Sequence, residues 1–268
     1  MNSGRASRLG LRTIALGYLG ALLVLPVGLV FYRTFEHGLA PAWDAVTTPE
    51  AQHAFWLTLV MVAIAVPANT IFGVGMALVI ARGRVRGKSF LSALIDLPFA
   101  VSPVVVGLAL ILVYGRDGWF GGWLTEHGIR VIFSTPGMVM ATIFVSLPFV
   151  VREVVPVLRE IGTEQEEASR TLGASDWQTF WRVTLPAIRW GVAYGVILTT
   201  ARALGEFGAV SVVSGKLAGQ TQTATLLVED RFQAFDLTGA YAASVVLALL
   251  AVAVILSMTL LDRRKREI

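Results

Sequence analysis

The sequence predicts an all-α integral membrane protein with six transmembrane helices. Of its 268 residues, 55% are hydrophobic and only 15% are charged, and its mean hydropathy of +0.70 lies above the range of soluble domains. Apolar runs of roughly 20 residues recur, which is the length that a helix needs to cross a bilayer. Helices are expected because lipid offers the backbone no hydrogen-bond partners. The runs lie near residues 13–32, 55–80, 90–114, 136–158, 188–213 and 238–261.

The first run is expected to stay in the membrane rather than to be a cleaved signal peptide. It is long, it contains Pro26, and no cleavage site of small residues precedes the next loop. We therefore expect a cytoplasmic tail at 1–12, a membrane domain at 13–261 and a basic cytoplasmic tail at 262–268. The chain has no cysteine, which excludes disulfides, thiolate metal sites and cysteine nucleophiles.

Basic residues are distributed unevenly over the expected loops. Sixteen of the 22 lie before the first run, in the second connection, in the fourth connection (taken from about Arg152 to Trp190) or at the end of the chain: Arg5, Arg8, Arg12, Arg82, Arg84, Arg86, Lys88, Arg152, Arg159, Arg170, Arg182, Arg189, Arg263, Arg264, Lys265 and Arg266. The other connections hold Arg33, Arg116, Arg130, Lys216 and Arg231. The positive-inside rule assigns the richer side, and with it both termini, to the cytoplasm. The pI of about 9.8 reflects this topology, since no basic patch with interleaved aromatics indicates a nucleic-acid site.

The connection at 160–187, between the fourth and fifth runs, carries signals for two short helices. Thr163 with Glu166 has the pattern of a capping box, and Ser175 with Gln178 repeats this pattern. Gly173 is placed to end the first helix in a left-handed conformation. The second helix, which starts at Ser175, would have one face made of Trp177, Phe180, Trp181 and Thr184.

This connection is predicted to be a docking surface. Small residues would let another backbone approach the bend, namely Ala168, Ser169, Gly173 and Ala174. Pro186 stands where a membrane helix can start. The alternative is an amphipathic hairpin that rests on the membrane surface, which explains the tryptophans but not the acidic first half.

The same stretch resembles the EAA loop of permease subunits of ABC importers, E-A-A-x-x-x-G-x9-I-x-L-P. The chain has Glu167-Ala168-Ser169, then Gly173, nine further residues, and Val183-x-Leu185-Pro186; Ser169 and Val183 are the two departures. The resemblance implies the binding-protein-dependent (MetI-like) permease fold. In that family the loop is a coupling helix in a cleft of a cytoplasmic ATPase, and ATP binding switches the permease between inward-open and outward-open states. ATPase coupling is thereby implied for Glu167, Ala168, Ser169, Gly173, Leu185 and Pro186.

A second stretch resembles the permeases that import oxyanions. Residues 201–215 read A-R-A-L-G-E-F-G-A-V-S-V-V-S-G, and a turn at 219–223 and the segment 226–229 follow. The G-E-F-G-A core is shared by sulfate and molybdate permeases, and its continuation resembles the W-type subunit of sulfate/thiosulfate importers. The likeness runs from the second apolar run to the end of the chain.

The resemblance implies a set of partners and a location. It implies a sulfate/thiosulfate permease in the bacterial inner membrane, with molybdate or tungstate as the alternative cargo. The implied partners are a cytoplasmic ABC ATPase dimer that holds ATP and Mg, a second permease of T type and an extracytoplasmic sulfate-binding protein.

Arg202 and Glu206 are the ionisable residues deepest in an apolar run. Charge inside a membrane is costly, so a functional role is the default interpretation. They are also four residues apart on one helix face, where they can neutralise each other. Gly205 and Gly208 would allow a neighbouring helix to pack there. We favour a structural pair over direct contact with an anion, and both interpretations remain open.

Asp96, Pro98, Ser102 and Pro103 form the other unusual cluster. Two prolines five residues apart should break the helix near its cytoplasmic end and leave carbonyls without partners. Such breaks line transport paths or serve as packing kinks, and the sequence favours neither. The candidates for a translocation path or an intramembrane pair are therefore Arg202, Glu206, Ser102 and Pro103.

Other classes of protein find less support. The sequence has no G-x4-G-K-[ST] phosphate loop, so the chain is expected to bind no cofactor and not to be an enzyme. The histidines are placed in outer loops at unrelated spacings, which indicates neither a metal site nor a catalytic triad: His37, His53 and His127. A secondary transporter driven by an ion gradient would need internal repeats and titratable groups along its path, and the sequence shows no convincing repeat.

Overall fold

The computed structural model describes residues 3–83 and 86–266, and within these ranges it is built of helices without a β-strand. Two short π-helical segments, η1 and η2, interrupt the α-helices. In chain order the elements are α1 (Ser3–Leu19), η1 (Gly20–Val24), α2 (Leu25–Phe35), α3 (Leu39–Val46), α4 (Pro49–Ala81), α5 (Lys88–Ala100), α6 (Pro103–Tyr114), α7 (Gly121–Glu126), α8 (Thr135–Ser146), α9 (Pro148–Glu160), α10 (Glu164–Thr171), α11 (Asp176–Thr179), η2 (Phe180–Thr184), α12 (Leu185–Leu204), α13 (Gly208–Val213), α14 (Ala224–Gln233) and α15 (Leu237–Arg266).

Several of these helices begin at a proline, whose missing N–H costs nothing in the first turn. Pro49, Pro103 and Pro148 open α4, α6 and α9. At α4 the preceding Thr48 also accepts a hydrogen bond from the amide of Ala51 at 3.2 Å, which caps the helix.

Among the described residues, five helical stretches are long and apolar enough to cross a membrane: Gly10–Phe35, Pro49–Ala81, Thr135–Glu160, Asp176–Leu204 and Leu237–Ser257. A sixth crossing is possible only if α5 and α6, which are bent by 108°, count as one. The expected run 90–114 is therefore two helices. The sequence predicted a break near the cytoplasmic end of this run. The observed break comes only after 13 residues of helix, or roughly 20 Å, so its predicted position is wrong.

The expected run 188–213 also differs from the structure. Its helix begins earlier, because Asp176–Leu204 is continuous through η2, and Pro186 does not start a new helix. In η2 the amide of Leu185 bonds to the carbonyl of Phe180, a π-type register that accommodates the proline that follows. The run also ends earlier, at Leu204, and resumes as the separate helix α13.

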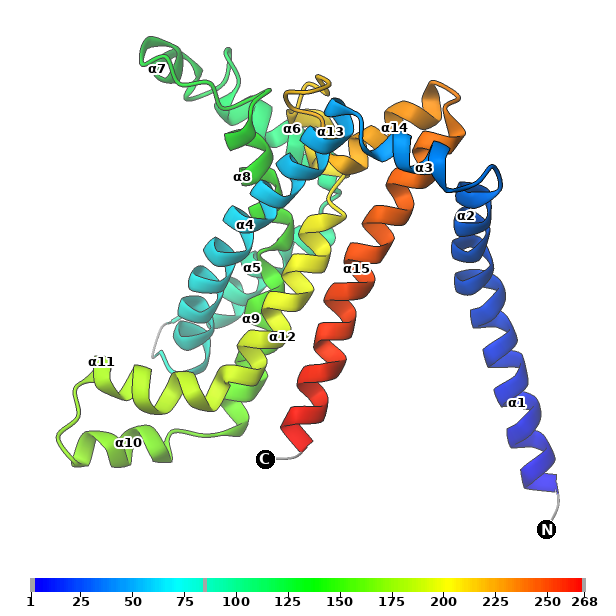
Figure 1. Ribbon diagram of the computed structural model, residues 1–268. Coiled ribbons are helices and arrows are strands. Elements are labelled where there is room, and N and C mark those ends of the chain that lie inside the picture. Colours follow the sequence, from blue (N-terminus) through cyan, green and yellow to red (C-terminus); the bar gives the residue numbers. More distant parts are fainter. Residues whose placement is uncertain (1–2, 84–85, 267–268) are drawn as a thin grey trace.

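The centre of the bundle is formed by α4, α9 and α12, which pack side by side (Figure 1). Val150 of α9 is fully buried between glycines of the other two helices. A Cβ placed on Gly73 of α4 would lie 2.7 Å from the Cβ of Val150, and one on Gly195 of α12 would lie 2.8 Å from its Cα. The absence of side chains at these two positions is what allows the three backbones to approach one another.

The break between α8 and α9 has its own polar support. The amide of Leu147 turns to the carbonyl of Phe144, which frees the carbonyl of Ile143. Asn69 of α4 donates to this carbonyl at 3.0 Å and also to the hydroxyl of Ser146 at 2.9 Å.

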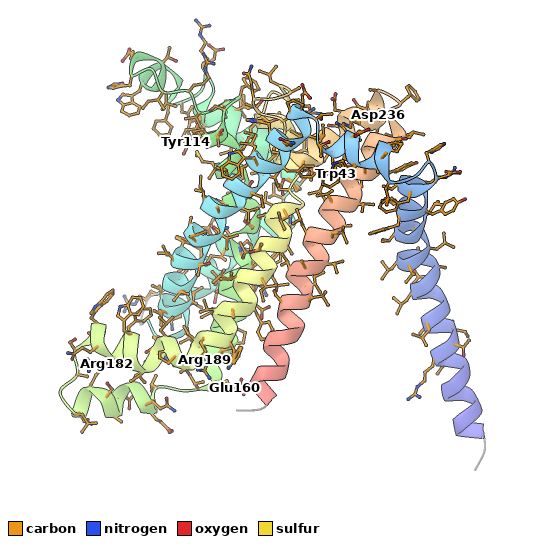
Figure 2. The ribbon with its side chains drawn as sticks, in the orientation of Figure 1. Trp43, Tyr114, Glu160, Arg182, Arg189 and Asp236 are labelled. Carbon is orange, nitrogen blue, oxygen red and sulfur yellow. The ribbon has the colours of Figure 1, made fainter. Side chains whose placement is uncertain are left out.

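Both termini and the α10–α11 hairpin lie at one end of the molecule (Figure 1). Glu160, Arg182 and Arg189 lie at this end and Trp43, Tyr114 and Asp236 at the opposite end (Figure 2). The terminal helices extend into the expected tails, since α1 begins at Ser3 and α15 continues to Arg266. Arg84, one of the basic residues counted above, lies outside the described residues.

Candidate functional site

The α10–α11 hairpin has the bend that the sequence predicts. Gly173 follows α10 with a φ of +85°, in the left-handed region. Ser175 and Gln178 form the predicted capping box: the Gln178 amide donates to the Ser175 hydroxyl at 3.3 Å, and the Ser175 amide donates to the Gln178 side chain at 3.0 Å. Both local predictions are confirmed.

The other predicted capping box, Thr163 with Glu166, is wrong. The Thr163 side chain makes no capping bond and instead donates to Oε1 of the exposed Glu167 at 2.7 Å. Glu166 is buried, with 7% of the residue exposed, and points to other partners. A buried carboxylate gains more from a cation than from a backbone amide, which explains why Glu166 does not take the capping position.

Glu166 joins the hairpin to the membrane helices. Arg82, the residue that follows α4, donates through Nε to Oε2 and Oε1 of Glu166 at 3.1 and 3.3 Å. Its Nη2 donates to the carbonyl of Gly162. The hydroxyl of Thr184, in η2, donates to Glu166 Oε1 at 3.0 Å. One buried carboxylate therefore connects α4, α10 and the helix that continues into α12.

Further contacts hold the two arms of the hairpin together. The hydroxyls of Ser169 and Thr179 lie 3.1 Å apart, and Arg170 donates to Asp176 at 3.0 Å. The predicted aromatic face is present as a cluster in which neighbouring ring centroids lie 5.4 to 6.2 Å apart: Trp177, Phe180 and Trp181. Both tryptophans remain half exposed or more. The hairpin is thus internally braced and has apolar surface left over for a partner.

An open groove of about 690 Å³ lies against the hairpin and the start of α12. Three of the six residues predicted for ATPase coupling line it, Ala168, Ser169 and Pro186, together with Gln165, Leu172, Ala174, Arg182, Val183 and Ala187. Glu167, Gly173 and Leu185 do not line it. The small side chains keep the groove open, and 89% of Leu172 is exposed at its edge. Its mixed lining suits a protein segment better than a small ion.

Arg202 and Glu206 form the predicted ion pair, with Nη1 and Oε2 2.6 Å apart. They do not share one helix face, because α12 ends at Leu204 and Glu206 lies in the break. The Glu206 side chain is 1% exposed, and its Oε1 accepts from the amide of Ala209 at 2.9 Å. Thr225 donates to the Glu206 carbonyl at 2.8 Å. Glu206 therefore caps α13 and fixes the break between the two helices.

The break after α12 meets the break between α5 and α6. A Cβ on Gly208 would lie 2.8 Å from the Cβ of Pro103, so α13 packs closely on the first turn of α6. Gly205 has no such neighbour, contrary to expectation. Ser102 precedes α6, and its side chain makes no capping bond. Of the four candidates for the path, the structure brings Glu206 and Pro103 into the same region and pairs Arg202 with Glu206.

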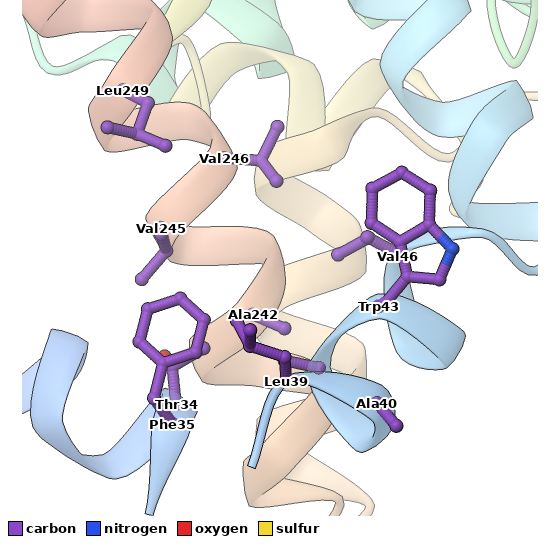
Figure 3. A pocket seen from close by; sticks show the side chains of 11 residues that line it. Thr34, Phe35, Leu39, Ala40, Trp43, Val46, Ala242, Val245, Val246 and Leu249 are labelled. Carbon is purple, nitrogen blue, oxygen red and sulfur yellow. The ribbon is translucent and has the colours of Figure 1, made fainter.

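An apolar pocket of about 560 Å³ lies between α2, α3 and α15 (Figure 3). None of its eleven lining residues is charged, and the hydroxyl of Thr34 is bonded to the carbonyl of Val30 at 2.8 Å. This pocket therefore offers an anion no charged side chain. His53 lies in α4 rather than in a loop, and its ring contacts the carbonyl of Gln220. Across the described ranges, no group of three His, Asp or Glu side chains could hold a metal ion.

Comparisons with known proteins agree with this architecture. The family model of the binding-protein-dependent transport system inner membrane component matches residues 69–267. The sulfate transport system permease protein CysW of Synechocystis sp. is 53% identical over 94% of this chain and 91% of its own. The permease protein CysT of Escherichia coli (strain K12) is 39% identical over 88% and 87%.

A solved structure shows the same fold at lower identity. A chain of a bacterial ABC transporter that imports the acidic polysaccharide alginate superimposes with a TM-score of 0.81 at 18% identity, over 98% of this chain and 97% of that one. The chain therefore belongs to the family of binding-protein-dependent transport system inner membrane components.

Proposed function

We propose that this chain is a membrane-spanning permease subunit of an ATP-driven importer that carries sulfate or thiosulfate into the cell. The observation that carries the proposal is the braced α10–α11 hairpin. It presents three of the six predicted coupling residues in an open groove and is connected to α4 and α12 through Glu166. Such a hairpin can transmit the movement of an ATPase to the membrane helices.

The proposed topology has six spans, with the bent pair α5–α6 as one of them and both termini in the cytoplasm. The common position of the termini and the hairpin supports it (Figure 1). Basic residues concentrate in the segments at that end, as the positive-inside rule requires. The proposed location is the inner membrane of a bacterium.

Sulfate is the proposed cargo because of the likeness to sulfate permeases, in which about half of all residues are identical over nearly the whole chain. A dianion that is strongly hydrated needs weak, changing contacts inside the membrane. Arg202, in the last turn of α12, is neutralised by Glu206, which fits this requirement. No observation favours molybdate, tungstate or an ion-gradient mechanism.

The proposed partners are a cytoplasmic ATPase dimer, a second permease of T type and an extracytoplasmic sulfate-binding protein. ATP and Mg would be held by the ATPase, because this sequence has no phosphate loop. The half-exposed tryptophans and the groove of the hairpin supply the surface for ATPase docking.

The test is uptake of labelled sulfate in a strain that lacks its own copy of the subunit. The chain should restore uptake, and unlabelled sulfate should compete better than molybdate. Glu167→Lys should abolish uptake at an unchanged membrane level, because it reverses an exposed charge on the docking surface. Glu126→Lys, an equally drastic change at an exposed position of α7, serves as the control and should transport normally. Normal uptake by Glu167→Lys would remove the docking role, and stronger competition by molybdate would change the cargo.

A further inference from the structure

Asp96 of α5 and Arg152 of α9 form an ion pair with two contacts, Nε to Oδ1 at 2.7 Å and Nη2 to Oδ2 at 2.6 Å. Unlike Glu166 and Glu206, this pair is open to its surroundings. The side chains are 32% and 59% exposed. Nothing in the function described so far uses it.

The two residues lie at the same depth. Asp96 comes eight residues after Lys88, where α5 begins, and Arg152 comes eight residues before Glu160, where α9 ends. Each is therefore about 12 Å from the hairpin end of its helix. An exposed charge at that depth is costly against lipid, so such a group faces a water-filled path or another protein.

A pocket of about 270 Å³ opens beside the pair. Asp96 and Arg152 line it with Ser92, which is one turn nearer the start of α5, and Arg159, which is two turns nearer the end of α9. Its remaining walls are mostly apolar: Ile80, Ile95, Val151, Val155 and Pro156. The polar groups thus continue from the pair toward the end of the molecule that carries the hairpin. The volume equals about nine waters at about 30 Å³ each, which leaves room for a small ion with part of its hydration shell.

We propose that this pocket is a contact site for the tetrahedral oxyanion as it leaves toward the cytoplasm. Arg152 would bind it, and Asp96 would compete with it for the guanidinium. The planar fork that now holds two carboxylate oxygens can hold two oxygens of a sulfate in the same way. Arg159 supplies a second cation farther along the pocket. This inference rests on the proposed function.

Asp96 would prevent Arg152 from trapping the dianion. A lone arginine in a narrow path would bind sulfate too firmly for release, whereas transport needs contacts that can be exchanged. With Asp96 beside it, Arg152 can return to its carboxylate once the anion moves on. The contact between Arg152 and the anion is thus temporary, and the contact between Arg152 and Asp96 replaces it.

The experiment uses proteoliposomes that contain the complete importer and are loaded internally with sulfate. Uptake of labelled sulfate is measured against internal sulfate concentration, with internal chloride at equal ionic strength as the control for screening. The measured quantity is the internal concentration that halves the rate, because it reports a site reached from the cytoplasmic side. A residue with only a structural role would change the amount of active complex but not this concentration.

Arg152→Gln should raise the half-inhibitory concentration about tenfold or more, the factor expected when one hydrogen bond to a charged group is lost. Arg152→Lys should give a smaller increase, because lysine keeps the charge but lacks the fork. Asp96→Asn should lower the value, since the competing carboxylate is gone. Arg33→Gln is the matched control, because Arg33 and Glu36 form a pair of similar exposure, 53% and 32%, in another part of the chain. It should leave the value unchanged.

Several outcomes would contradict the proposal that this pocket binds the anion. Wild-type uptake that internal sulfate does not inhibit would exclude a site open to the cytoplasm. Variants of Arg152 and Asp96 that lose complex but keep the wild-type value would assign the pair to packing, for example against the second permease. Both results require that the wild-type complex transports sulfate, so they differ from a failure of the proposed function, in which no sulfate uptake occurs at all.

Discussion

Arg82 and Glu166 form an ion pair between residues 84 positions apart, at the junction of α4 with the hairpin. The atoms Nε and Oε2 are 3.1 Å apart, and the two side chains are only 17% and 9% exposed. Thr184 bonds to the same carboxylate at 3.0 Å. A rotation of α10 would break these contacts together, so the hairpin, α4 and α12 are expected to move as one body.

Removing one partner of this pair should loosen the hairpin. Glu166→Ala leaves the guanidinium of Arg82 partly buried without a carboxylate, at a cost of roughly 3 kcal/mol. The expected result is faster hydrogen exchange in α10 and more ATP hydrolysed per sulfate transported. The control is Asp176→Ala, which breaks the exposed pair with Arg170 and should cost less than about 1 kcal/mol. Equal exchange rates in the two variants would show that Glu166 does not hold the hairpin.

Small substitutions at Gly173 should be destabilising because of its backbone conformation. Its φ is +85°, and no atom lies within 4 Å of a Cβ placed there. Gly173→Ala should therefore cost roughly 1 to 2 kcal/mol through the left-handed backbone, and Gly173→Asn should cost less. Gly173→Trp should abolish uptake while membrane insertion stays normal, because a large side chain would project from the bend. Uptake assays at matched membrane levels would compare the three variants. Full activity of Gly173→Trp would exclude docking at the bend.

Gly195 should resist substitution for the opposite reason. Its backbone is helical, but a Cβ would lie 2.8 Å from the Cα of Val150, an atom that can move only with α9. Gly195→Ala should lower stability by about 1 to 3 kcal/mol, as overpacking does. Gly75→Ala is the control, because that glycine of α4 has no atom within 4 Å of a Cβ. Thermal unfolding of the purified protein would compare them, and an equal effect of both would refute close packing at Gly195.

The predictions that held concern residues close together in sequence. The left-handed Gly173 and the box of Ser175 with Gln178 depend on a few neighbouring groups, so the sequence pattern determines them. The pattern of Thr163 and Glu166 was as good, yet it failed because Arg82 offered Glu166 a charged partner. That contact depends on how α4 packs against the hairpin, which no local pattern reveals.

The predicted membrane runs also fail where the structure depends on contacts between distant parts of the chain. Hydropathy predicted apolar runs, but both 90–114 and 188–213 are interrupted by breaks. Pro98 and Pro103 gave a signal for the first break, whereas Gly205 and Gly208 were interpreted only as packing positions. The segment between α12 and α13 can leave the helix because Glu206 caps α13 and Thr225 bonds to its carbonyl. The partner Thr225 comes from another helix, so the sequence could not identify it.

Arg202→Ala should reduce the amount of folded protein rather than change its selectivity. Without Arg202, the carboxylate of Glu206 stays buried with 1% of its side chain exposed and only the Ala209 amide bonded to Oε1. Leaving such a charge without its partner costs about 3 to 5 kcal/mol. The measurements are the yield of monodisperse protein in detergent and the ratio of sulfate to molybdate uptake per molecule.

A second variant separates a structural pair from an anion contact. Arg202→Met combined with Glu206→Gln removes both charges, while the glutamine oxygen can still accept from the amide of Ala209. Its yield should recover part of the loss seen in Arg202→Ala, because no buried charge remains unpaired. If Arg202 instead contacts the anion, Arg202→Ala would fold in normal amounts with an altered uptake ratio, and the double variant would be as defective in transport. The ion pair at 2.6 Å and the capping bond at 2.9 Å favour the first result.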